Sequence, residues 1–288
     1  MKPILALFLL IICYTANAGT GKPVANKPGQ TTADTDSVVR KQSLSIGVSY
    51  GSDIIFFGRT SQHKFPYLTG DFVYNTKSGF FVYTSVVNIT NLTPAFNEVD
   101  FGAGYIFRPS SKFSITPSYT RFVFNKDAPI IKSTSSNDID LKNTYDFKIV
   151  KSSIIVDYLF GRTSDIFVTI SNTHHFESNF SIFNDNDYLT FDPAFNVILG
   201  TQNFVESYDD DFHNKHYGFP PRYQSDGDRN AARVFDGLNY SFKIPIAYNM
   251  PHYTFELAYK YSVPINVQGP LINHKESFLN LTFYYVFY

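Results

Sequence analysis

The chain has 288 residues and a formal net charge of −1, and 18% of its residues are aromatic because it carries 30 phenylalanines and 21 tyrosines. This charge gives no basic surface of the kind that nucleic-acid recognition requires, so we expect no nucleic-acid partner. A mean hydropathy of −0.15 combined with so many aromatics is typical of strands that alternate apolar and polar side chains in a membrane barrel.

The N-terminal segment has the pattern of a secretory signal peptide. A positive start at Lys2 precedes an almost unbroken apolar run from Ile4 to Cys13, and Ala16-Asn17-Ala18 supplies a small-x-small cleavage pattern. The run is too short for a membrane-spanning helix, which needs about 20 apolar residues. We therefore predict a signal peptide over residues 1–18, cleaved near Ala18, and export of the remaining chain.

Cys13 is the only cysteine in the chain. It allows a lipoprotein interpretation, which is disfavoured because Ile11 and Ile12 precede it where small residues are expected. Cleavage would leave no cysteine, which excludes disulfides and cysteine-ligated metals, and we expect no cofactor. Residues 19–41, rich in Gly, Pro, Thr and Asp, lack periodicity and are predicted to be a flexible periplasmic lead-in.

From residue 42 onward the apolar residues recur with a period of two, which is the pattern of half-buried strands. Twelve strands are predicted, at 43–50, 67–74, 80–89, 99–107, 113–120, 154–160, 166–173, 177–184, 188–205, 238–248, 253–261 and 278–288. The alternative is that Ile166 to Phe183 forms one long strand, which lowers the number to ten.

Short and long connections alternate along the chain. The short turns are 75–79, 108–112, 161–165, 249–252 and Asn184–Asp187, and the longer polar links are 51–65, 90–97, 125–143, 206–236 and 264–276. Outer-membrane barrels have short periplasmic turns and long external loops. We therefore expect both ends of the barrel in the periplasm, which requires an even number of strands.

The last strand, residues 278–288, ends on an aromatic residue. Two registers are open: Thr282, Tyr284, Val286 and Tyr288 share one face, and the more apolar Leu279, Leu281, Phe283, Tyr285 and Phe287 share the other. A terminal aromatic with aromatics spaced by two resembles the C-terminal signal of bacterial outer-membrane barrels. It implies the barrel-assembly machinery as a partner.

These features predict one all-β domain over residues 42–288, a transmembrane antiparallel up-and-down β-barrel surrounded by outer-membrane lipid and lipopolysaccharide. A soluble β-sandwich or barrel is the alternative, because it also has strands at regular spacing. The membrane barrel is favoured because Tyr74, Tyr105, Tyr119 and Tyr248 lie near strand ends, where aromatic girdles occur.

Charged residues occur on the predicted inward faces of the strands. They are Asp71, Asp100, Asp157, Lys243, Glu256 and Lys260. Lys243 and Glu256 are equidistant from the 249/250 turn, so a tight hairpin would place them directly opposite each other. Such charges either fill and rigidify a narrow lumen or line a polar pore, because interiors near eight strands are filled by side chains and much wider ones conduct.

Two acidic segments in the longest loop are weak candidates for ligand binding. Asp209, Asp210, Asp211, His213 and His216 could ligate a hard cation or Zn²⁺, and Asp226-Gly-Asp228 begins like a calcium loop. The calcium pattern then fails, because Ala231 replaces the required glycine and Gly237 the bidentate glutamate. A solvated acidic loop is the favoured interpretation, and no metal site is predicted.

His174 and His175, flanked by Ser171 and Glu177, are the one group that suggests a hydrolase. Outer-membrane phospholipases place a Ser/His pair on the rim of a twelve-stranded barrel, but such sites are recognised by geometry rather than by sequence order. We predict no catalytic residue and treat a lipid hydrolase as the third functional possibility.

Several segments resemble uncharacterised outer-membrane β-barrel proteins of Bacteroidota. The resemblance lies in Phe65-Pro-Tyr-Leu-Thr69, Tyr74-Asn-Thr-Lys-Ser-Gly79, Phe191 to Gln202 and the aromatic terminus, and it covers about residues 42 to 288. It implies an architecture and an outer-membrane location, and no catalytic residue.

The leading functional prediction is a narrow passive channel for small polar solutes, with lumen charges setting its selectivity. The second is a plugged structural or surface-interaction barrel whose loops at 125–143 and 206–236 bind an external ligand of unknown chemistry.

Overall fold

A computed structural model describes residues 42–90, 96–125, 134–205, 234–269 and 271–288 of the chain. The predicted signal peptide (1–18) and lead-in (19–41) lie outside these residues. Within the described part, no helix is long and apolar enough to cross a membrane.

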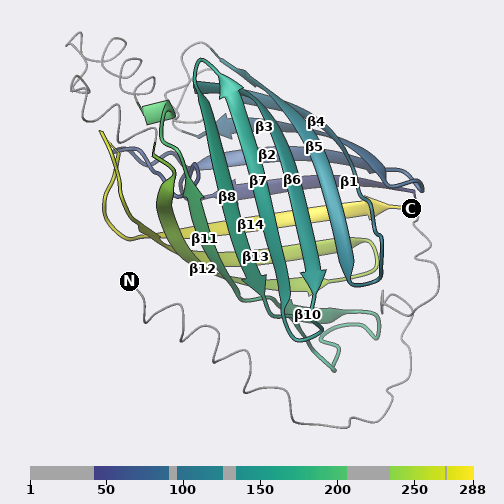
Figure 1. The fold of residues 1–288 in the computed structure, drawn as a ribbon. Helices are drawn as coiled ribbons and strands as arrows, with labels where there is room; N and C mark the ends of the chain where they lie inside the picture. Colours follow the sequence, from purple (N-terminus) through teal and green to yellow (C-terminus); the bar gives the residue numbers. More distant parts are fainter. Residues whose placement is uncertain (1–41, 91–95, 126–133, 206–233, 270) are drawn as a thin grey trace. The chain divides into compact units, whose positions relative to one another are not determined.

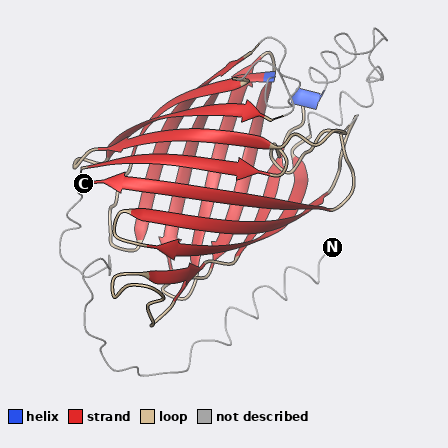
Figure 2. Cartoon of the chain, turned by 180° about the vertical axis from the view of Figure 1, so that it is seen from behind, coloured by secondary structure: helices blue, strands red, loops and turns tan. Residues whose placement is uncertain are grey.

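The described residues form a closed antiparallel barrel of twelve strands, as the sequence predicts (Figures 1 and 2). Its strands are β1 (Ser43–Gly51), β2 (Tyr67–Asn75), β3 (Phe80–Ile89), β4 (Glu98–Tyr105), β5 (Phe113–Phe124), β6 (Ser135–Asp146), β7 (Lys151–Gly161), β8 (Ser164–Thr173), β11 (Ala194–Gly200), β12 (Asp236–Asn249), β13 (Tyr253–Pro264) and β14 (Glu276–Phe287). Consecutive strands pair, β8 pairs with β11, and β1 pairs with β14 to close the ring. Closure leaves no unpaired barrel edge.

Two further short strands, β9 (Phe176–Glu177) and β10 (Tyr188–Phe191), extend the sheet beyond the ring. β10 pairs with the last residues of β12, and β9 pairs with β10. The segments β9 and β10 therefore form a hairpin that continues the wall formed by β8 and β11 (Figure 1).

The two ends of the barrel differ in their connections. The short-turn rim carries the links 76–79, 106–112, 147–150 and 250–252, together with the long link 174–193 that contains β9 and β10. The long-loop rim carries 52–66, 90–97, 125–134, 201–235 and 265–275, together with the short turn 162–163. β1 begins and β14 ends at the short-turn rim, since Ser43 pairs with Asn75 and Leu44 with Phe287.

The outer face of the wall is apolar. On β14, Leu279, Phe283 and Phe287 are 51%, 44% and 48% exposed, so the more apolar of the two possible registers faces outward. Residues between them, such as Asn280 and Thr282, face inward. This arrangement is the reverse of a soluble β-sandwich, which would bury its apolar faces in a core.

Glycines make room for aromatic rings that lie flat against the inner wall. A Cβ atom added to Gly102 on β4 would lie 2.2 Å from the ring of Tyr83 on β3, and one added to Gly47 on β1 would lie 2.3 Å from Tyr284 on β14. Only glycine allows an aromatic side chain of the neighbouring strand to approach so closely.

Although the number of strands is predicted correctly, two errors in their positions cancel. The segment 125–143, predicted to be a loop, contains most of β6, whose alternation is hidden because its outer face is interrupted by Asn137 and Asn143. The predicted strand 177–184 does not form: only Phe176 and Glu177 are in strand conformation, and a turn follows.

The predicted strand 188–205 is broken at Asp192-Pro193, between β10 and β11. Proline has no backbone N–H with which to continue the ladder, which is a physical reason for the interruption. The turn at 161–165, predicted to lie with the short turns, lies instead at the long-loop rim: the Arg162 N–H donates to the Thr134 carbonyl, at the start of β6.

Candidate functional site

The barrel contains a cavity of about 510 Å³ that both polar and apolar side chains line. Its polar lining includes Asp100, Asp138, Asp140 and Lys260, together with hydroxyls of Tyr83 and Thr120. Residues 55–58 of the link between β1 and β2 border it as well. Because acidic and basic side chains from different strands border the same space, the lumen is narrow at this level.

Carboxylates gather on one side of the interior. Asp100 on β4 and Asp157 on β7 are each 8% exposed, and Asp157 pairs in register with Asp140 on β6. Ser118 on β5 donates a hydrogen bond to Asp140. We call Asp100, Asp138, Asp140 and Asp157 the acidic wall.

Half of the acidic wall is absent from the predicted inward charges, because β6 is predicted to be a loop. The signal that could have revealed Asp138 and Asp140 is the alternating run Asp138-Ile-Asp-Leu141, in which Ile139 and Leu141 face outward and are 51% and 41% exposed. Asp71 also faces inward, on β2, and accepts a hydrogen bond from Thr69.

The basic residues lie on β12 and β13. Lys243 pairs in register with Lys260, not with Glu256 as the sequence predicts, because the strands join through a longer turn in which Asn249 pairs with Thr254. Lys243 nevertheless reaches Glu256 diagonally, with 3.3 Å between Nζ and Oε1. This ion pair offsets the repulsion between two lysines placed directly opposite each other.

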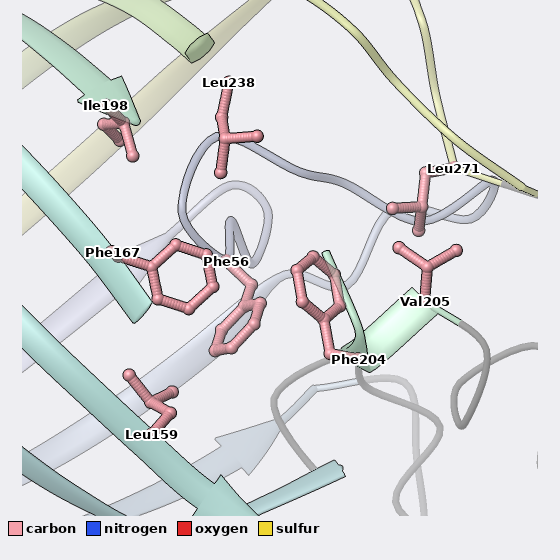
Figure 3. Close-up of a cluster of buried hydrophobic side chains, with 8 residues drawn as sticks. All are labelled: Phe56, Leu159, Phe167, Ile198, Phe204, Val205, Leu238 and Leu271. Atoms are coloured by element: carbon pink, nitrogen blue, oxygen red, sulfur yellow. The ribbon is translucent and has the colours of Figure 1, made fainter. Parts of the chain in front are cut away.

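The link between β1 and β2 folds into the long-loop end of the barrel. Phe56 is 5% exposed and is the centre of a buried apolar cluster, which we call the mouth cluster (Figure 3). The cluster consists of Phe56, Leu159, Phe167, Ile198, Phe204, Val205, Leu238 and Leu271. Phe57 stacks on Phe167 with ring centroids 3.8 Å apart. The mouth cluster therefore closes the cavity toward the long-loop rim.

Arg59 anchors this link to the long-loop ends of β11, β12 and β13. Its side chain is 0% exposed. Nε donates to the side-chain oxygen of Gln202 at 2.9 Å, and the terminal nitrogens donate to the carbonyls of Leu238 and Ile265 at 2.6 and 2.8 Å. Burial lowers the pKa of Arg59 to about 10, so the guanidinium remains charged at neutral pH.

The backbone of the link has the left-handed conformation at Phe57 (φ 44°) and Gly58 (φ 81°). A side chain at Gly58 would lie 2.3 Å from Asn239, whose amide donates to Ser262 at 2.5 Å. The turn can therefore enter the barrel only because Gly58 lacks a side chain.

The histidines of the hydrolase hypothesis lie between β8 and β9, at the short-turn rim. His175 Nδ1 is 2.5 Å from Asp192 and Nε2 is 3.8 Å from Glu177. His174 contacts the carbonyl of Ile149. In the described part of the chain Ser171 has no hydrogen bond to either histidine, and no group of three or more His, Cys, Asp or Glu residues could hold a metal ion.

The loop candidates Asp209, Asp210, Asp211, His213 and His216 lie outside the described residues, as do residues 226–230.

No protein-family model and no curated protein matches the sequence. Among solved structures, the KdgM porin is similar, with a TM-score of 0.50, 9% identity and coverage of 85% of this chain and 99% of the porin. The NanC porin gives a TM-score of 0.46 at 10% identity and covers 83% and 98%, and LpxR from Salmonella typhimurium gives 0.44 at 9% and covers 84% and 99%. At 9% identity, the match to the KdgM porin shows the fold alone, a closed antiparallel β-barrel.

Proposed function

We propose that this protein is an outer-membrane channel for small polar solutes, closed at its long-loop end by the link between β1 and β2. The observation that carries this proposal is a cavity bordered by the charged side chains of Asp100, Asp138, Asp140 and Lys260 inside a wall with an apolar exterior. An apolar outer face suits hydrocarbon, and a charged interior suits water and polar solutes.

The proposed solute class follows from the distribution of charge. Four carboxylates lie close together on β4, β6 and β7, whereas Lys243 is already paired with Glu256. A ring or wall of carboxylates attracts cations and repels anions at close range. We infer that the lumen prefers cations and neutral polar solutes over anions.

The second candidate function, a plugged barrel that acts through its external loops, is favoured by the mouth cluster. Phe56, Phe167 and Phe204 are almost fully buried, and each of the three guanidinium nitrogens of Arg59 donates a hydrogen bond. If this seal is permanent, solutes do not pass and the function lies in the loops.

Outer-membrane location, insertion through the barrel-assembly machinery by way of β14, and a Bacteroidota-type source belong to the same proposal. They rest on the signal-peptide pattern of residues 1–18, on the aromatic alternation of β14, on the segments 65–69, 74–79 and 191–202 that carry the family resemblance, and on the apolar exterior. A lipid hydrolase remains the third possibility. It gains little support, because His175 is next to Asp192 and Glu177 rather than a serine.

The experiment is single-channel recording of the refolded protein in a planar bilayer, with Arg59→Ala as the comparison. Removing Arg59 takes the arginine donor away from the Gln202 side-chain oxygen and the Ile265 carbonyl, at a cost on the order of 1–3 kcal/mol each, whereas the Leu238 carbonyl still accepts the Ile265 N–H. The link should therefore leave the lumen more often. We expect rare openings in the native protein and frequent openings in Arg59→Ala. Two folded but silent proteins would favour the plugged barrel.

A further inference from the structure

We propose that residues 178–187, the tip of the β9–β10 hairpin, form a membrane-interface anchor that inserts its apolar side chains among lipid headgroups beside the short-turn rim. The inference rests on the proposed membrane location of the barrel. It assigns a lipid-binding role to a segment that the sequence predicts to be part strand and part turn.

The tip presents large apolar side chains to the outside. Phe183 is 84% exposed, the highest value among the large hydrophobic residues of the described chain, and Phe180 and Ile182 are 58% and 41% exposed. Water-exposed aromatic side chains at the end of a barrel are unfavourable unless they meet an interface, where an aromatic body is stabilised.

The tip is held in a fixed shape rather than left to fold back on itself. The Asp187 carboxylate is 1% exposed and accepts three backbone N–H bonds, from Ile182 at 2.7 Å, from Phe183 at 2.8 Å and from Asn184 at 3.0 Å. Ser178 completes the base of the turn, because its hydroxyl accepts the N–H of Leu189 at 3.0 Å. This internal bonding keeps Phe183 exposed.

The tip is attached to the outer face of the barrel and not to the lumen. Tyr248, which faces outward on β12, donates its hydroxyl to Asp187 at 2.8 Å. The ring of Phe183 lies edge-on to Tyr248 at 5.9 Å, Tyr248 lies 6.3 Å from Tyr253, and Tyr253 lies 6.1 Å from Phe283. The tip thus continues the apolar exterior of the wall beyond the short-turn rim.

The chemistry of the tip matches the boundary between headgroups and hydrocarbon. Its apolar residues are followed directly by Asn184-Asp-Asn186, all three exposed. A short segment that joins aromatic and amide side chains suits the interface, where one side is apolar and the other is wet.

The test uses the absence of tryptophan from the chain. Phe183→Trp places the only tryptophan of the protein at the tip. The protein is refolded into phosphatidylcholine vesicles that contain brominated lipids, which quench tryptophan fluorescence. The bromines lie either near the headgroup or deep in the acyl chain. Leu281→Trp, on the outward face of β14, is the control for insertion of the barrel. Lys77→Trp, in the exposed turn between β2 and β3 at the same rim, is the control for water.

We expect blue-shifted emission from Phe183→Trp, with stronger quenching by the shallow bromines than by the deep ones, and no quenching of Lys77→Trp. If Leu281→Trp is quenched while Phe183→Trp behaves like Lys77→Trp, the anchor is absent and the barrel is inserted. If Leu281→Trp is not quenched, the membrane barrel itself is refuted, and the anchor with it. Phe180→Trp repeats the measurement if Phe183→Trp fails to fold.

Discussion

Glycines on the inner wall determine how closely an aromatic ring of the neighbouring strand can approach the backbone. Tyr83 lies over Gly102 and forms a hydrogen bond with Thr120, which limits how far its ring can move. A methyl group at Gly102 would overlap this ring at 2.2 Å. We expect Gly102→Ala to lower the free energy of unfolding by about 1–3 kcal/mol, the usual cost of overpacking.

Urea unfolding in detergent, followed by heat-modifiable gel migration, measures this loss. Gly70→Ala on β2 is the matched control, because nothing lies within 4 Å of the added methyl group. Equal stability of the two variants would show that Tyr83 moves aside freely.

Asp53 gives the β1–β2 link a dependence on pH. Its carboxylate accepts the N–H groups of Ile54 and Phe65 at 2.9 and 2.7 Å. Burial raises the pKa of Asp53 above its ordinary value of 3.8, and Glu276 adds to the rise, although the N–H of Phe65 opposes it. Asp53 therefore binds a proton more tightly when the link is closed than when the link is open and the carboxyl is exposed to water. Protonation of Asp53 stabilises the closed link, and this stabilisation is lost as the pH rises through the raised pKa.

We therefore expect the link to open less as pH falls from neutral toward 3.8. The measurement is the ratio of two rates, at which a thiol reagent labels Ser61→Cys and Ser78→Cys. Ser61 is 7% exposed when the link is closed, whereas Ser78 lies in an exposed turn and serves as the reference. The ratio should fall with pH, and Asp53→Asn should remove most of that dependence. A ratio with the same slope in both proteins would assign the effect to another group.

At the scale of elements, periodicity predicts the strands whose outer faces are continuous and fails where polar residues interrupt them. β12 and β13 are found because Tyr240, Phe242, Ile244 and their partners alternate without a gap. β6 is missed because Asn137 and Asn143 face outward between its apolar residues. A strand at this position is imposed by pairing with β5 and β7, which no single segment reveals.

The mouth cluster could not be predicted from the sequence, for a related reason. Phe56 and Phe57 occur in a link that the sequence shows only as a non-periodic polar loop. Their partners come from β7, β8, β11 and β12 and from the links that follow β11 and β13. Contacts between residues so distant in sequence depend on closure of the ring. The charged positions on regular strands, such as Asp100 and Lys260, are predicted because alternation alone determines that they face inward.

At the scale of the whole molecule, closure brings charges from opposite walls to one narrow cavity. Three members of the acidic wall, Asp100, Asp138 and Asp140, border it together with Lys260, so the sign of the field inside depends on few side chains. In a confined, partly water-excluded lumen, each charge acts on a passing ion more strongly than it would at the protein surface.

Removal of one carboxylate from the cavity should therefore change ion preference without changing the fold. We expect Asp140→Asn to shift the reversal potential, measured under a salt gradient, toward lower cation preference, because the lumen loses a negative charge that borders the cavity. Asp138→Asn should shift it in the same direction. Asp185→Asn, at the exposed tip of the β9–β10 hairpin, removes the same charge outside the barrel and should leave the reversal potential unchanged. If the Asp140 and Asp138 variants conduct with native selectivity, ions follow a path that avoids this cavity, and the acidic wall has a structural role only.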